Sequence, residues 1–142
     1  MSISELLGIW RLVSFEMEDV TSGERHLIFG ENPRGFLNFT PEGRVFAILT
    51  SSSRRPPISD SERARAFLDT IAYTGKYRIE NDKFIANIDV SWAEQLVGME
   101  RVQTYVLKGD RLNIVSSPTP HSLYPGKMLR ALLEWKRENP EF

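Results

Sequence analysis

The chain has 142 residues, of which 41% are hydrophobic and 26% are charged, a balance typical of one folded globular domain. Its 18 basic and 19 acidic residues give a formal charge of −1, so no overall field attracts nucleic acid or an anionic membrane surface. The sequence contains no cysteine, which excludes disulfides, thiolate nucleophiles and thiolate-bound metal. We expect a single domain over residues 1–142, with no nucleic-acid or membrane partner.

The start of the chain predicts a cytoplasmic location. Residues 1–8 lack both the basic region and the long apolar core of a secretion signal. The lack of cysteine also fits a reducing compartment.

The first half of the chain is predicted to form short strands separated by turns. Its stretches of aromatic and β-branched residues alternate with clusters of Gly, Pro, Ser and Asn, the pattern of an all-β barrel or sandwich. The predicted strands cover residues 8–19, 25–29 (the weaker one), 36–40 and 44–50. The last two are joined by Pro41-Glu42-Gly43, which predicts a hairpin.

One segment between the halves predicts a helix at about 60–71. Four apolar residues recur there at helical spacing, and Ser59 with Glu62 three residues later forms a capping-box pattern. The apolar stripe consists of Ala64, Phe67, Leu68 and Ile71. We expect this helix near the mouth of the barrel, as a mobile lid or as a fixed plug.

The second half predicts two more hairpins. Asn81-Asp82 and Lys108-Gly109-Asp110 provide the turns. The strands that they join cover residues 73–80, 83–91, 99–107 and 111–115. Along 73–80, aromatic and aliphatic residues alternate with polar ones, so the face with the two tyrosines should point inward.

One short helix cannot cover roughly eight strands, and an open sheet of that size leaves unpaired edges. The fold class that follows is all-β: an up-and-down antiparallel barrel of about eight strands with one short helix.

Several motifs strengthen this prediction because they resemble one family. The opening Gly8-Ile9-Trp10 is similar to the Gly-x-Trp start of lipocalin-like proteins, and further motifs follow in the order of the small bacterial and fungal lipocalin-like domain family. They are Pro33-Arg34-Gly35-Phe36-Leu37, Thr40-Pro41-Glu42-Gly43-Arg44, Ala72-Tyr73-Thr74-Gly75-Lys76-Tyr77, Gly109-Asp110-Arg111-Leu112 and Leu133-Glu134-Trp135-Lys136-Arg137. The resemblance implies a calycin-type barrel whose tryptophan plugs the closed end.

The resemblance leaves the function open, because the family includes simple binders and proteins associated with small-molecule biosynthesis. The sequence also departs from the family pattern in one place. Family members often carry one or two histidines within the strand at 83–91, where this chain has Ile85-Ala86-Asn87-Ile88-Asp89-Val90-Ser91.

The first functional hypothesis is binding of a small, largely apolar or aromatic molecule inside the barrel, without a cofactor. Aromatic walls with a few polar groups are typical of such pockets. The candidate ligand contacts are Phe36, Asn38, Phe46, Tyr73, Tyr77, Asn87, Asp89, Trp92, Arg101 and Tyr105. Three structural alternatives stand beside them: the aromatics form the core, the polar side chains of strand 83–91 face solvent, and Arg101 pairs with an acid at the end of the barrel.

The second hypothesis is a cofactor-free isomerase, cyclase or dehydratase that acts on a hydrophobic biosynthetic intermediate in the same cavity. The available acids and bases are Asp89, His121, Tyr77 and Glu100, and desolvation would raise the pKa of a carboxyl group there. We place His121 in a loop at 116–126. His26 and His121 lack metal-ligand spacing, so no metal site is expected.

A third alternative is an interaction module whose barrel is filled by its own side chains. An exposed aromatic strand would favour it. The chain is predicted to be a monomer or a homodimer.

Overall fold

The structure, a computed structural model, describes residues 5–121 and 124–139. The main regular elements of this part of the chain are ten strands, the α-helix α1 and the 3-10 helix η2. Their bounds are β1 Gly8–Asp19, β2 Arg25–His26, β3 Arg34–Phe39, β4 Arg44–Thr50, α1 Asp60–Leu68, β5 Thr70–Glu80, β6 Lys83–Ser91, η2 Glu94–Leu96, β7 Glu100–Lys108, β8 Arg111–Ser116, β9 Thr119–His121 and β10 Tyr124–Arg137.

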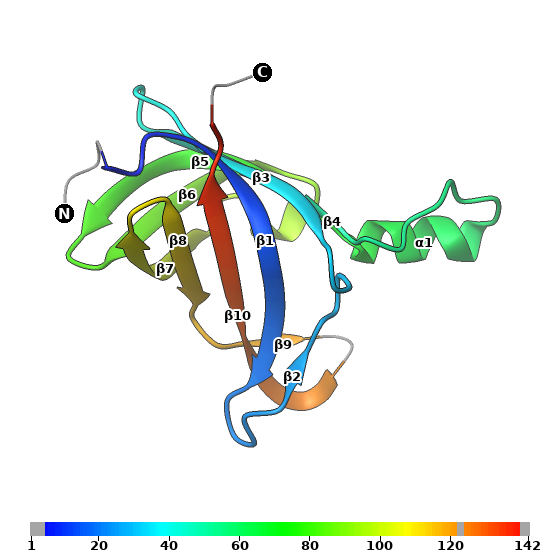
Figure 1. The fold of residues 1–142 in the computed structure, drawn as a ribbon. Helices are drawn as coiled ribbons and strands as arrows, with labels where there is room; N and C mark the ends of the chain where they lie inside the picture. Colours follow the sequence, from blue (N-terminus) through cyan, green and yellow to red (C-terminus); the bar gives the residue numbers. More distant parts are fainter. Residues whose placement is uncertain (1–4, 122–123, 140–142) are drawn as a thin grey trace.

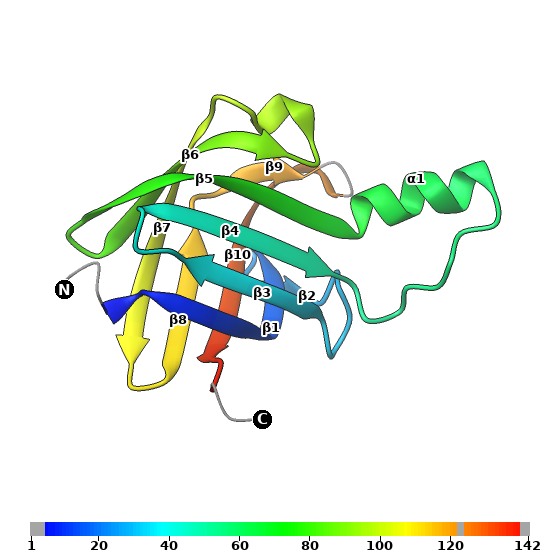
Figure 2. The same cartoon turned by 90° about the horizontal axis from the view of Figure 1, so that it is seen from above.

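Eight of the strands form a closed antiparallel barrel. Neighbours pair in the order β1-β3-β4-β5-β6-β7-β8-β10, and β10 pairs back with β1 to close the tube. The long β1 and β10 lie side by side along one wall (Figure 1). The view from above shows the strands curving around a common interior (Figure 2). The predicted all-β barrel of about eight strands is therefore confirmed, and β2 and β9 are short additions to β1 and β10.

Most strand bounds follow the sequence pattern closely. β1, β4 and β6 have the predicted bounds, whereas β2 is only two residues long. The long final strand β10 and the short β9 were missed. Pro125 and Gly126 lie inside β10, and such residues normally indicate a turn. His121 lies in β9, whereas the sequence analysis placed it in a loop at 116–126.

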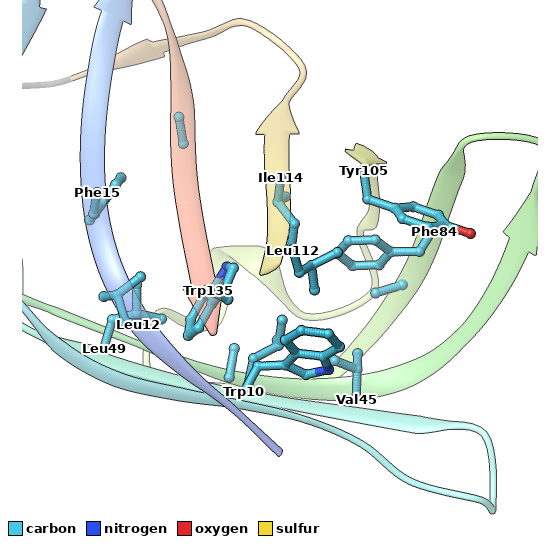
Figure 3. Packing of buried hydrophobic residues seen from close by; sticks show 14 of the residues in the cluster. Trp10, Leu12, Phe15, Val45, Leu49, Phe84, Tyr105, Leu112, Ile114 and Trp135 are labelled. Carbon is cyan, nitrogen blue, oxygen red and sulfur yellow. The ribbon is translucent and has the colours of Figure 1, made fainter. Parts of the chain in front are cut away.

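One end of the barrel is filled by aromatic side chains. Trp10 and Trp135 lie at the centre of this end (Figure 3). The indole N–H of Trp10 donates to the carbonyl of Leu6 at 3.0 Å, and the Arg137 guanidinium stacks on its ring, 4.1 Å from the centroid. This is the closed end that the Gly-x-Trp motif implied.

A bulge between β5 and β6 bends this wall of the barrel. Thr74 pairs with Val90 and Gly75 with Ile88, so Asp89 is the extra residue. A side chain at Gly75 would have its Cβ 2.0 Å from the Asn87 carbonyl oxygen. Glycine is needed there because the β6 backbone passes so close.

Helix α1 extends beside the barrel, connecting β4 to β5 (Figure 1). Ser59 caps it as predicted, because its hydroxyl accepts a hydrogen bond from the Glu62 N–H at 3.2 Å. The helix ends at Leu68, and Ile71 already belongs to β5, so the predicted bounds of 60–71 were three residues too long.

No residue of the helix is buried, and its last residues Phe67 and Leu68 lie at the mouth of the barrel. In the described part of the chain, no helix is long and apolar enough to cross a membrane.

Candidate functional site

The open half of the barrel contains a cavity. Its volume is about 330 Å³, and a narrower recess of about 40 Å³ lies deeper in the barrel. Phe15, Ile71, Arg101 and Ala131 line both spaces. The volume of the outer space lies at the lower end of the range of small-molecule pockets.

Loops and helix ends form the rim of this cavity. Phe29, from the connection between β2 and β3, packs edge-on against Phe15 with ring centroids 5.0 Å apart. On the other side, the Trp92 indole N–H donates to the Phe67 carbonyl at 3.2 Å and joins the end of α1 to the segment before η2. Side chains from widely separated segments therefore enclose the entrance.

The polar groups of the deeper recess come mainly from β7 and β5, whereas the outer cavity has polar lining residues from several elements, among them Asp69 and His121. Arg101 and Gln103 of β7 and Tyr73 of β5 line the deeper recess. Arg101 lies 5.5 Å from the centre of the Tyr73 ring, within the range of a cation–π contact. These three side chains place hydrogen-bond donors among apolar walls.

The expected acid partner of Arg101 is absent from the described residues. Alternation along β7 turns the neighbouring Glu100 outward, where it binds Arg78 at 3.2 Å. Among the described residues Arg101 makes no ion pair. The barrel-end acid pair considered for this arginine is therefore not observed there.

Burial shifts the pKa of two groups that line the cavity. It raises the pKa of the Tyr73 hydroxyl, and the nearby Arg101 only partly opposes this effect. Tyr73 therefore stays protonated at neutral pH. Burial lowers the pKa of His121 at the rim, which favours its neutral imidazole.

Three predicted ligand contacts lie on the outside of the barrel. Phe36, Asn38 and Phe46 alternate with the buried residues of β3 and β4, and both phenylalanines are 45% exposed. The prediction that they line the interior is wrong. The strand period of two places their neighbours Leu37 and Ala47 inside.

These outward side chains surround a shallow, open depression on the wall formed by β3, β4, β5 and β6. It has a volume of about 840 Å³ and mostly apolar walls. Because it is open to solvent on one side, it would enclose a ligand less than the barrel cavity does. The exposed aromatics are the feature that would favour an interaction module.

Asn87 and Asp89 also face solvent, as predicted by the alternative in which the polar side chains of strand 83–91 point outward. Both side chains are exposed on the outer face of β6, and the Asp89 carboxylate accepts two hydrogen bonds of 2.9 Å from Arg44. These bonds lower the pKa of the Asp89 carboxyl group. The expectation of a desolvated acid with a raised pKa is therefore wrong for Asp89.

Tyr77 and Tyr105 point inward but lie in the packed, closed half. The Tyr77 ring packs against Phe39 with centroids 5.0 Å apart, and Tyr105 lies 6.3 Å from Phe84. Neither residue lines the cavity. The inward face predicted for β5 is confirmed, whereas the placement of these two tyrosines beside a ligand is wrong.

Tyr73, Trp92, Arg101 and His121 are the predicted site residues that the fold brings to the cavity. Residues that the prediction missed include Phe15, Gln103 and Ala131. A bulge between Leu12 and Ser14 changes which residues of β1 face inward, so simple alternation from Trp10 does not identify Phe15.

The comparisons with known proteins agree with this architecture. No curated protein gives a significant match to the chain. The sequence model of the lipocalin-like domain, in contrast, matches residues 7–138, from the start of the barrel to just past its last strand. The chain therefore belongs to the lipocalin-like domain family.

Proposed function

We propose that the protein binds a compact, largely apolar or aromatic molecule in the cavity at the open end of its barrel. The observation that carries this proposal is the partly enclosed space of about 330 Å³ between the packed barrel end and the rim. Its walls combine apolar side chains such as Phe15, Ile71 and Ala131 with polar ones, and ligand pockets use both kinds of contact. Membership of a lipocalin-like family supports the same general role.

Catalysis in the same cavity has less support. Of the four proposed acid and base groups, Asp89 and Glu100 lie on the outer face and Tyr77 in the packed end. Only His121 lines the cavity. No arrangement of the described side chains favours turnover over binding, so we propose binding alone.

A neutral fluorescent probe, N-phenyl-1-naphthylamine, tests the proposal. We expect it to bind the wild-type protein with an increase in fluorescence, because its rings would leave water for apolar walls. Ala131 lines both parts of the cavity, so the larger side chains of Ala131→Leu and Ala131→Phe should weaken binding stepwise, by tenfold or more for Phe.

The matched control is Ala64→Phe, which adds the same ring to an exposed position of α1. It should leave the affinity unchanged. Circular dichroism and thermal unfolding check that each variant is folded. Wild-type affinity in a folded Ala131→Phe variant would contradict the proposed cavity, as would failure of the wild-type protein to bind the probe.

A further inference from the structure

The position of Arg101 indicates the chemical class of the ligand. Its side chain enters the barrel from β7, on the same face as the buried Gln103 and Tyr105. It lines both the open cavity and the deeper recess. A guanidinium group keeps its charge at all physiological pH values, so Arg101 adds a positive charge to the cavity beside the Arg65–Asp69 ion pair.

Three acids at the open end of the barrel bind other cations, among them Asp69, which lines the cavity together with its partner Arg65. Asp69 pairs with Arg65 at 3.3 Å, and Asp19 with Lys127 at 3.7 Å. The third, Glu18, accepts hydrogen bonds from Arg130 at 2.6 Å and Arg25 at 3.3 Å. Among the described residues, Arg101 makes no ion pair, and its one aromatic contact is with the Tyr73 ring.

A partly buried charge without a counter-charge is unfavourable, and proteins normally pair such groups. The polar side chains that line the deeper recess with Arg101 add donors and no negative charge. Tyr73 supplies a hydroxyl that stays protonated, and Gln103, itself only 6% exposed, supplies an amide. A ligand that brings an anionic group would complete this arrangement.

We propose that the natural ligand is a compact organic acid whose carboxylate pairs with Arg101 while its apolar part lies between Phe15, Ile71 and Ala131. This inference rests on the proposed binding function and names the chemical class of the ligand. The size of the cavity favours an acid with a ring system of about naphthalene size. A long-chain acid would extend out of the mouth.

The test compares molecules that share one ring system and differ in the charged group. 1-Naphthylacetic acid and its neutral amide compete with N-phenyl-1-naphthylamine for the cavity. We expect the acid to bind wild-type protein about tenfold or more tightly than the amide, since hydrogen bonds to charged groups are the stronger ones. The Arg101→Met variant should lose this preference and keep its affinity for the amide.

The control Arg34→Met removes one positive charge from an exposed position of β3 and should keep the full preference for the acid. Arg101→Lys keeps the charge but not the forked geometry, and it should give an intermediate preference. If Arg101→Met does not fold, the Lys variant and the wild-type comparison of acid with amide still decide the question.

The outcomes separate this inference from the proposed function. Equal binding of acid and amide to the wild-type protein would overturn the acid assignment and leave apolar binding intact. If the wild-type protein binds neither the acid nor the amide and also fails to bind the naphthylamine probe, both the acid assignment and the proposed function are overturned. Tighter binding of 1-naphthyl phosphate than of the carboxylate would also overturn the assignment, in favour of a phosphate ester.

Discussion

Glu18 shows how a single side chain near the barrel mouth depends on its neighbours. It is a glutamate of β1 that is only 8% exposed, and hydrogen bonds from Arg130, followed by Arg25, lower the pKa of its carboxyl group below the ordinary value of 4.5. Its stabilising contribution is therefore complete above about pH 4.5 and disappears as the pH falls through the lower folded-state pKa.

We predict that Glu18→Gln lowers the free energy of unfolding at pH 7, because Arg130 and Arg25 lose their charged acceptor. The difference from wild type should shrink below about pH 4.5, where the unfolded wild-type chain takes up its proton first. Urea unfolding between pH 7 and pH 3 measures this. Glu42→Gln changes the net charge equally at an exposed turn, and a similar pH-dependent loss in that variant would refute the assignment to Glu18.

At the scale of elements, the sequence predicted secondary structure better than it predicted contacts. The Ser59 cap and the apolar spacing correctly placed the start of α1, but the stripe suggested a covered face that the structure does not provide. Phe67 and Leu68 are each 48% exposed. Burial therefore contributes little to this helix of nine residues, and a helix of that length is only marginally stable by itself.

We predict that Ser59→Ala loosens α1 without unfolding the barrel. Losing an N-cap costs about 0.5–2 kcal/mol of helix stability, so the α1 amides should exchange with solvent roughly 2- to 30-fold faster. Hydrogen exchange followed by NMR measures this, and the amides of β1 and β10 should keep their protection. Ser61→Ala removes the 3.2 Å hydrogen bond between the two serine hydroxyls but leaves the capping oxygen in place, and it should have a much smaller effect than Ser59→Ala. Loss of protection throughout the barrel would contradict this prediction.

At the scale of the whole molecule, closure depends on β1 meeting β10 and on the packed end beneath the cavity. Trp10 is fully buried there, and Arg137 holds the preceding segment by donating to the carbonyls of Leu7 and Glu5 at 2.8 and 2.7 Å. These contacts join residues near the two ends of the chain. The tube is therefore closed by long-range contacts that no single hairpin provides.

We predict that Trp10→Ala destabilises the whole protein by about 3–5 kcal/mol, the usual cost of removing a buried aromatic side chain. Denaturant unfolding measured by circular dichroism should show one cooperative transition at lower denaturant concentration. Trp92→Ala is the matched control at the partly exposed rim, and it should cost about 1 kcal/mol. Equal losses in the two variants would show that the closed end is not the main source of stability.

Alternation and turn chemistry were sufficient to predict the class of fold, most strand bounds and the inward face of β5, because these features depend on neighbours within a few residues. The positions of the cavity residues required the folded chain. The bulges in β1 and at Gly75, β10 with its internal Pro125-Gly126, and the filling of only one barrel end arise from pairing between distant strands. That is why Tyr77 and Tyr105 belong to the core, and why Arg101 faces a cavity without an ion pair among the described residues.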